Sequence, residues 1–273
     1  MNPKTLLDQH KLQPKKGLGQ NFLHDPGALD KIAELAEITP EDIVLEIGPG
    51  TGALTQYLAR AAKKVIAVEV DERLKPILDS ELSAYPNVWV IYQDILTVDV
   101  AALLHSQPYI VVANLPYYIT SAILRHLLES NHPPRRLVMT VQLEVAERIV
   151  AKPDEMSLLS VSVQFYGAAR IVNRIKPATF WPRPDVESAV IRIDVYDRPP
   201  VDVPDTSTFF RVVRAGFSQK RKQLKNSLGG GLGIGTTQAG ELLERAGIDP
   251  RRRAETLTLE EWAALSRAMQ PAT

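Results

Sequence analysis

Short apolar runs alternate with helical patterns through the first 150 residues of this chain, and this alternation constrains its fold most strongly. Strands are predicted at 43–47, 65–70, 88–92, 109–113 and 137–141. Helical patterns follow the strands, at 53–62, 72–83, 121–129 and 143–150. Repeated βα units of this length build a doubly wound, mostly parallel sheet, so the predicted fold class is α/β.

The remainder of the chain departs from this alternation. Runs at 172–175 and 189–195 are predicted to form a late hairpin, and 161–166 fits either a helix or a strand. Prolines at 199, 200 and 204 mark a linker. The patterns beyond it are all helical, at 208–217, 221–228, 237–246 and 259–269, with a glycine-rich loop predicted at 228–235. We therefore predict a sheet domain at 1–200, with a basic N-terminal arm at 1–25, and a small all-helical domain at 201–273.

Composition excludes several kinds of site. The chain has no cysteine, which excludes a disulfide scaffold, a thiolate metal site and a cysteine nucleophile. Its five histidines show no metal-ligand spacing, so we expect no metal. No stretch approaches the roughly 20 apolar residues that span a bilayer, and the N-terminus lacks the apolar core of a signal peptide. We expect a cytoplasmic monomer without a membrane partner.

The formal net charge is zero, but positive charge is concentrated in two segments. No aspartate or glutamate occurs between Thr206 and Gly240. Segregated positive charge favours contacts to phosphates, whereas the alternative is a solvated helix face. The candidate nucleic-acid-binding residues are Lys15, Lys16, Arg211, Arg214, Lys220, Arg221, Lys222 and Lys225.

Candidate ligand-binding residues stand where the predicted strands end, which is where open parallel sheets bind ligands. Glu46 begins a glycine-rich turn that contains Gly48 and Gly50, and glycines there allow a ligand to approach the backbone. Glu69 ends the second strand and could accept both hydroxyl groups of a ribose. Asp94 follows the third strand and could accept a hydrogen bond from an adenine amino group.

The fourth strand is followed by Asn114, Leu115, Pro116 and Tyr117. The side-chain carbonyl of Asn114 and the backbone carbonyl of Leu115 can accept both hydrogens of an exocyclic amine. Pro116 has a fixed φ and no competing N–H, and Tyr117 offers a ring on which a base can stack. The alternative is an ordinary strand-to-helix turn, in which asparagine and proline are common.

The glycine turn does not fit a dinucleotide, for two reasons. A nicotinamide dinucleotide site has the fingerprint G-x-G-x-x-G, but here the third glycine comes one residue early, as Gly52. Glu46 beside the turn would also repel a pyrophosphate. A carboxylate there suits a cationic ligand, such as the ammonium and sulfonium of S-adenosylmethionine.

These segments resemble the KsgA/RsmA family of ribosomal RNA adenine dimethyltransferases over nearly the whole chain. The similar segments are 19–23 (GQNFL), 45–55 (LEIGPGTGALT), 93–95 (QDI), 114–117 (NLPY), 180–188 (FWPRPDVES) and 217–226 (FSQKRKQLKN). The resemblance implies a Rossmann-like class I methyltransferase sheet, S-adenosylmethionine as cofactor, and ribosomal RNA within an immature small subunit as partner. It also implies dimethylation of the N6 amino groups of two adjacent adenines near the 3′ end of small-subunit RNA, with a role in subunit biogenesis.

The resemblance further implies roles for individual residues. It places Asn21, Leu23, Gly48, Glu69, Asp94 and Asn114 at the cofactor, and Tyr117 and Phe180 on either side of the target base. We expect Phe180 in a surface loop, because prolines at 182 and 184 follow it. One residue departs from the family pattern, since Tyr118 stands where asparagine is usual.

Three alternatives remain open from the sequence. The first is a large-subunit RNA methyltransferase of the macrolide-resistance type, and the second is a DNA adenine methyltransferase. The segment 217–226 and the acid-free helical tail favour the small-subunit enzyme over the first. A DNA enzyme would more usually carry Asp or Ser at position 114 and a separate base-reading domain. The third alternative is a ribosome-assembly factor whose methylation is secondary.

Overall fold

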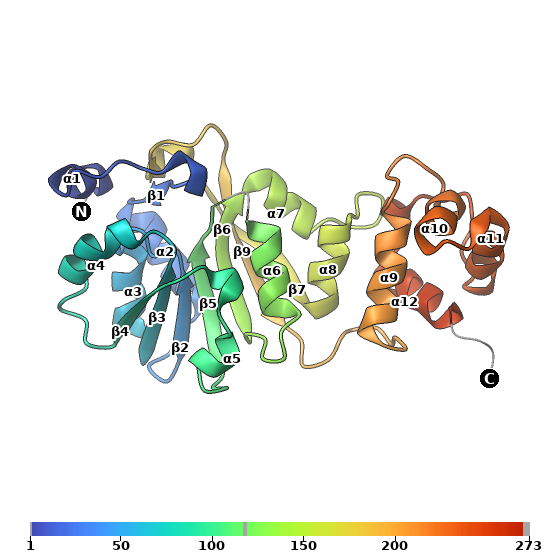
Figure 1. Cartoon of the computed structure of the whole chain (residues 1–273), viewed down its shortest axis with the longest axis horizontal. Helices are drawn as coiled ribbons and strands as arrows, with labels where there is room; N and C mark the ends of the chain where they lie inside the picture. Colours follow the sequence, from blue (N-terminus) through green and yellow to red (C-terminus); the bar gives the residue numbers. More distant parts are fainter. Residues whose placement is uncertain (1, 117–118, 270–273) are drawn as a thin grey trace. The chain divides into compact units, whose positions relative to one another are not determined.

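The computed structural model describes residues 2–116 and 119–269, and the chain divides into two compact units (Figure 1). The sheet unit comprises Met1–Ala146 and Ala168–Val195, and the helical unit comprises Glu147–Gly167 and Tyr196–Thr273. This division differs from the one expected at residue 200. The segment Glu147–Gly167 groups with the helical unit because Phe165 stacks on Phe209, with ring centroids 4.5 Å apart.

The sheet unit is built on seven strands in the order β4-β3-β2-β5-β6-β9-β7. The strands that pair in parallel are β2 (Ile43–Ile47), β3 (Lys64–Glu69), β4 (Val88–Tyr92), β5 (Tyr109–Asn114) and β6 (Arg136–Gln142). Strand β9 (Ser188–Val195) pairs antiparallel with β6. Strand β7 (Gly167–Ile175) is the neighbour of β9 on its other side, at the edge of the sheet. The predicted parallel α/β sheet is confirmed. The two late strands are neighbours as expected, but β8 (Phe180–Trp181) lies between them in sequence.

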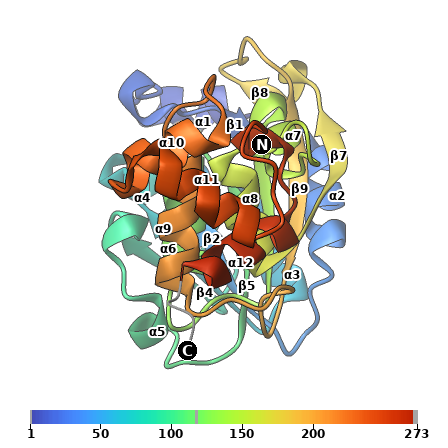
Figure 2. The ribbon, with the colours of Figure 1, turned by 90° about the vertical axis from the view of Figure 1, so that its right-hand side faces the viewer.

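Helices cover both faces of this sheet. Figure 2 shows α2 (Pro26–Ala36) and α3 (Ala53–Ala61) on the side opposite α6 (Thr120–Leu128). Apolar side chains of α2 and α3, including Ile32 and Leu58, share one core with Val112 and Val138 of the strands. The other helical elements of the unit are α1 (Pro3–Gln9), η1 (Lys16–Leu18), η2 (Glu72–Leu74), α4 (Lys75–Glu81), η3 (Ile95–Thr97), α5 (Val100–Leu103) and η4 (Pro177–Thr179).

The N-terminal arm is packed against the sheet unit rather than extended from it. Leu6 and Leu7 of α1 are buried in a cluster with Ile77 and Leu78 of α4. Further along, β1 (Phe22–Leu23) pairs antiparallel with β8 in a separate two-stranded sheet. These contacts bring residues 18–23 to the carboxyl ends of the parallel strands.

The helical unit surrounds the fully buried Trp262. Its helices are α8 (Leu158–Tyr166), α9 (Thr206–Gly216), α10 (Leu224–Leu232), α11 (Gly235–Arg245) and α12 (Leu259–Ala268), with η5 (Ala254–Thr256), and α7 (Leu143–Ile149) leads into the unit. The ambiguous segment 161–166 is therefore helical, and a capping box between Ser157 and Ser160 starts its helix.

The loop predicted at 228–235 is wrong over most of its length, because α10 continues to Leu232. Gly229 and Gly231 permit close helix packing, while Gly233 ends the helix in the left-handed conformation. A Cβ on Gly231 would lie 2.6 Å from Cα of Ala215, and one on Gly229 would lie 2.8 Å from the backbone of Gly235. Only glycine at these positions lets α10 approach α9 and α11 so closely.

Candidate active site

A cavity of about 210 Å³ opens at the carboxyl ends of the parallel strands. The predicted cofactor residues come together there from five different segments. All eight line the cavity: Asn21, Leu23, Glu46, Gly48, Gly50, Glu69, Asp94 and Asn114. Leu115, Pro116 and Phe180 of the predicted catalytic set also line it. Tyr117 and the divergent Tyr118 lie outside the described residues.

Glu69 is held rigidly at the end of β3. Its Oε2 accepts from the backbone N–H of Gly50 at 3.1 Å, and its Oε1 accepts from the N–H of Asp71 at 2.9 Å. Burial raises the pKa of this carboxyl, while the backbone N–H donors oppose that shift. The Gly50 N–H is therefore directed at a carboxylate, which agrees with the absence of a pyrophosphate fingerprint in the turn.

Glu46 is the most deeply buried carboxyl group of the cavity, with 1% of its surface exposed. Its Oε2 has no hydrogen-bond partner among the described residues. Burial raises the pKa of Glu46 to about 8, helped by the charge of Glu69 and opposed by the hydroxyl of Thr55. An anionic Glu46 was expected beside the glycine turn, whereas this pKa favours the neutral carboxyl at pH 7.

Asp94 is an exposed residue that shapes the loop after β4. Its Oδ1 accepts from the N–H of Leu96 at 3.0 Å and so starts η3. The preceding residue, Gln93, donates its backbone N–H to the Glu69 carbonyl at 2.9 Å. The loop is thus tied to the strand that carries the proposed ribose carboxylate.

Asn114 ends β5 and contacts the N-terminal arm. Its Nδ2 donates to the backbone carbonyl of Asn21 at 3.1 Å, and the side chain of Asn21 donates to the carbonyl of Gly19 at 3.2 Å. The next peptide is fixed by a hydrogen bond from the Leu115 N–H to the Thr140 carbonyl on β6, at 3.2 Å. The Pro116 carbonyl accepts from Ile119 at 3.3 Å just before α6.

The expectation that Phe180 lies in a surface loop is wrong. Phe180 is only 4% exposed and pairs with Leu23 in the β1–β8 sheet. It belongs to the same apolar core as α2 and α3 while still lining the cavity. The prolines that follow it end the short strand without bringing it to the surface.

Sequence reasoning missed the contribution of Gln20 and Phe22. Gln20 donates its side-chain amide to Oδ2 of Asp71 at 2.8 Å, and a hydrogen bond from Arg73 holds the pKa of Asp71 below its usual range. Phe22 packs over the glycine turn, since a Cβ on Gly50 would lie 2.9 Å from its ring. Both residues stand in the 19–23 match, which was the only signal that could have identified them.

The charged residues of the helical unit fall into two groups. Arginines near its C-terminal end are paired, as in Arg252 with Glu261 and Arg267 with Glu260. The acid-free segment differs, because its cations form no ion pair among the described residues and are exposed or half-buried: Arg211, Arg214, Lys220, Arg221, Lys222 and Lys225. In the arm, Lys15 is exposed and the backbone of Lys16 begins η1.

Within the described part of the chain, no helix combines the length and apolar character needed to cross a bilayer.

The sheet order and the cavity at its carboxyl edge define a class I methyltransferase, whose methyl donor is S-adenosylmethionine. A family model for ribosomal RNA adenine dimethylases matches residues 11–270. The chain belongs to this family, and it is an S-adenosylmethionine-dependent adenine dimethyltransferase.

Individual proteins agree with this assignment. A curated relative from Geobacillus sp. (strain WCH70), ribosomal RNA small subunit methyltransferase A, is 46% identical over 98% of this chain and 95% of its own. Among solved structures, a dimethyladenosine transferase from Plasmodium falciparum is 26% identical with a TM-score of 0.75, covering 89% of this chain and 95% of that one. The 23S ribosomal RNA methyltransferase ErmE is 30% identical with a TM-score of 0.73, covering 91% and 99%.

Proposed function

We propose that this enzyme dimethylates the N6 amino groups of two adjacent adenines near the 3′ end of small-subunit (16S) ribosomal RNA, within an immature small subunit. Support for the small-subunit substrate comes from the curated relative of that name, which matches at 46% identity over almost the full length. Support for the chemistry comes from one observation above all. Asn114 lines the cavity with its Nδ2 already engaged, which leaves its carbonyl oxygen for an amine.

The cavity residues divide the binding of the methyl donor between them. Glu69 would accept the ribose hydroxyls, Asp94 the adenine amino group, and Glu46 would face the cationic amino-acid end. The bound cofactor supplies an activated methyl group on its sulfonium. The unpartnered Oε2 of Glu46 supports this arrangement, because a buried carboxyl without a donor is costly unless a ligand provides one.

The reaction centre would act mainly by positioning. The lone pair of an adenine amine is delocalised into the ring, so its nitrogen is a weak nucleophile. Hydrogen bonds to Asn114 Oδ1 and to the Leu115 carbonyl favour a tetrahedral nitrogen whose lone pair can attack. The described residues of the cavity wall include no histidine, and the mechanism requires no strong base. Unstacking the adenine costs a few kcal/mol, which stacking on Tyr117 and Phe180 would offset.

RNA would be held by the eight predicted basic residues, of which six lie in the helical unit. These six form no ion pair among the described residues, which supports the role because an unpaired cation can contact a phosphate. We further propose that the protein acts in the cytoplasm as a monomer and contributes to small-subunit assembly as well as to methylation.

A second candidate substrate is large-subunit RNA, favoured by the structural similarity to the 23S enzyme over 91% of this chain. A radiolabelled methyl-transfer assay separates the candidates by comparing immature small subunits, naked small-subunit RNA, large-subunit RNA and duplex DNA. We expect transfer to immature small subunits, at two adjacent adenines with two methyl groups each. Preferential labelling of large-subunit RNA or of DNA would overturn the proposal.

A further inference from the structure

The amide of Asn114 must present one particular end to the cavity if it is to accept a hydrogen bond from the target amine. An asparagine amide has a carbonyl oxygen at one end and an NH₂ group at the other, and rotation by 180° exchanges them. An NH₂ group facing the target amine would place donor against donor and leave the amine hydrogen unsatisfied. Something in the protein therefore has to select the productive orientation.

We infer that the backbone carbonyl of Asn21 is this positioning group, which fixes the Asn114 amide so that Oδ1 faces the target amine. The inference rests on the proposed function. A carbonyl oxygen can only accept, so whichever end of the amide lies 3.1 Å from it has to be the nitrogen. The oxygen then points to the other side of the amide, and Asn114 lines the cavity.

The Asn21 carbonyl is itself fixed on both sides in the chain. On its N-terminal side, Gln20 donates to Asp71 at 2.8 Å, and the side chain of Asn21 bonds the carbonyl of Gly19. On its C-terminal side, Phe22 pairs with Trp181 and packs over Gly50. A carbonyl held in this way can select one orientation of a neighbouring amide, whereas a mobile loop could not.

The same short segment also contacts the second half of the proposed base site. Leu23, two residues after Asn21, pairs with Phe180 in the β1–β8 sheet. Residues 21–23 therefore touch both the amine acceptor on β5 and the proposed stacking ring on β8. Residues 21–23 thereby position the Phe180 ring relative to Asn114, although they are part of neither β5 nor β8.

Asn114→Asp tests the inference, because it keeps an acceptor of the same size but removes the Nδ2–H donor. Above its pKa the new carboxylate turns an anionic oxygen toward the Asn21 carbonyl, which repels it. When protonated, the new carboxyl can donate its O–H to Asn21 and leave its carbonyl for the amine. We expect single-turnover methyl transfer at pH 8 to fall on the order of 100-fold, and the ratio of variant to wild-type rate to rise up to about tenfold per pH unit as pH falls. The comparison is made as a ratio at each pH because Glu46 and Glu69, which line the same cavity, titrate in both proteins.

Asn87→Asp is the matched control. Asn87 also donates its side-chain amide to backbone carbonyls, those of Ala59 and Ala62, at 2.8 and 3.0 Å, but it precedes β4 and does not line the cavity. This variant carries the same change of charge and loses the same kind of hydrogen bond. It should melt at a lower temperature than the wild type yet transfer methyl groups at the wild-type rate at every pH.

A substrate-free measurement separates this inference from the proposed function. In protein labelled with ¹³C, the carboxyl introduced by Asn114→Asp should titrate above the ordinary aspartate value of about 3.9, because the Asn21 carbonyl favours its protonated form. An ordinary or lowered pKa would overturn the inference, whatever RNA the enzyme modifies. So would a variant whose rate at pH 8 is within about threefold of wild type, or a rate ratio that does not change with pH. Failure of the wild-type protein to label small subunits would instead contradict the proposed function.

An amide-to-ester change at the Asn21–Phe22 bond provides a second variant with every side chain retained. An ester carbonyl is a weaker acceptor, so we expect a loss of about three- to tenfold in the single-turnover rate, as for about 1 kcal/mol of one hydrogen bond. The same change made in an Asn114→Ala background should have no further effect on the rate. An equal loss in both backgrounds would show that the ester acts through the fold and would overturn the inference.

Discussion

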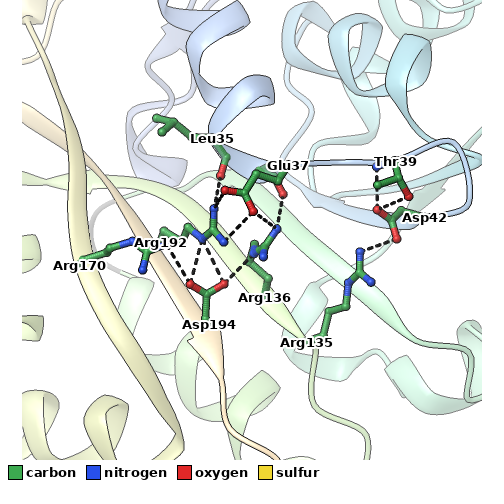
Figure 3. A network of polar contacts seen from close by, with 10 residues as sticks. Leu35, Glu37, Thr39, Asp42, Arg135, Arg136, Arg170, Arg192 and Asp194 are labelled. Atoms are coloured by element: carbon green, nitrogen blue, oxygen red, sulfur yellow. Dashed lines mark hydrogen bonds and ion pairs between the residues drawn. The ribbon is translucent and has the colours of Figure 1, made fainter.

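The two ends of the central sheet differ in whether arginines pair with their carboxyl groups. At the amino ends of the parallel strands, Arg136 on β6 and Arg192 on β9 bind Asp194 and Glu37 in a network that also takes up the last carbonyls of α2 (Figure 3). At the carboxyl ends, Glu46 and Glu69 share a cavity wall without any cation bonded to them among the described residues.

The pKa directions follow from this difference. At the network end, burial would raise the pKa of Asp194, but hydrogen bonds from Arg192 and Arg136 outweigh it and the pKa is lowered. At the cavity end, burial acts on Glu46 without a cationic partner, and its pKa rises to about 8. The network end pairs Asp194 with arginines, whereas Oε2 of Glu46 at the cavity end has no hydrogen-bond partner among the described residues.

The helical unit shows the same contrast on its surface. Arg252 donates to Glu261 and to the carbonyl of Thr256, and it helps to fix the approach to α12. The cations of the acid-free segment form no such pairs among the described residues. Paired arginines there have a structural role, and we interpret the unpaired ones as the RNA-binding set.

The largest expected effect is at the cavity end. Glu69→Ala removes the carboxylate that accepts from Gly50 in the glycine turn and from Asp71, and that is proposed to bind the ribose. We expect S-adenosylmethionine affinity to fall by more than about 100-fold, equivalent to about 3 kcal/mol, while circular dichroism shows a folded protein. Calorimetry that gave unchanged affinity would remove this carboxylate from the site.

The network end should respond in stability instead. Arg192→Met removes a guanidinium that bonds both Glu37 and the Leu35 carbonyl, at a position only 6% exposed in the wild type, and leaves only Arg136 paired with Glu37. We expect a loss of about 2–3 kcal/mol in the free energy of unfolding, measured by urea denaturation, with S-adenosylmethionine affinity unchanged. Because the pKa of Asp194 is lowered in the folded state, the stability it contributes is lost in acid, and the loss should be smaller in the variant. Equal stability of the two proteins at neutral pH would show that the network is dispensable.

The RNA-binding prediction concerns the unpaired cations. Replacing Lys220, Arg221, Lys222 and Lys225 by Gln should weaken RNA binding. The slope of log affinity against log salt should fall by up to about 3–4, because a protein that makes fewer phosphate contacts releases fewer counterions on binding. The matched control is Arg267→Gln, which removes a paired cation and should leave the slope unchanged. If both variants gave the wild-type slope, the acid-free segment would be only a solvated face.

The last prediction concerns the pH dependence of Glu46. The folded protein holds a proton that the unfolded chain releases near pH 4.5, so the wild type should lose stability between pH 4.5 and 8. The contribution of Glu46 to this slope approaches about 1.4 kcal/mol per pH unit, and Glu46→Gln should remove that contribution. S-adenosylmethionine affinity should rise over pH 6–7.5 in the wild type, as the bound cation draws the proton off, and should be flat in the variant. A flat wild-type profile would contradict the proposed contact to the cofactor's cationic end.

Much of this architecture could be predicted from sequence, because it depends on local pattern. The five parallel strands were visible as apolar runs, and their order along the chain brought the ends with Glu46, Glu69 and Asn114 together. What could not be predicted depended on distant packing. The glycines of α10 have the composition of a loop, and their close contacts with Ala215 and Gly235 appear only in the folded chain.

The same limit applies within the site. Phe180 precedes prolines and so has the local pattern of a surface loop, but its pairing with Leu23 buries it. Glu46 lines the cavity at the end of β2, but its raised pKa could not be predicted, because it depends on burial that only the folded chain creates. The contact between Asn114 and the Asn21 carbonyl joins residues 93 positions apart, and no local pattern signals it.

We infer that the cavity end of the sheet performs the chemistry while the network end maintains the fold. Single-turnover methyl transfer to immature small subunits, measured with thermal melting for Asn114→Ala and Arg192→Met, tests it directly. We predict that Asn114→Ala transfers methyl groups at least about 100-fold more slowly with a nearly unchanged melting temperature, as for loss of an acceptor that acts in the transition state. Arg192→Met should melt several degrees lower and react at close to the wild-type rate. Transfer by Asn114→Ala at the wild-type rate would contradict the account and return residues 114–117 to the status of an ordinary turn.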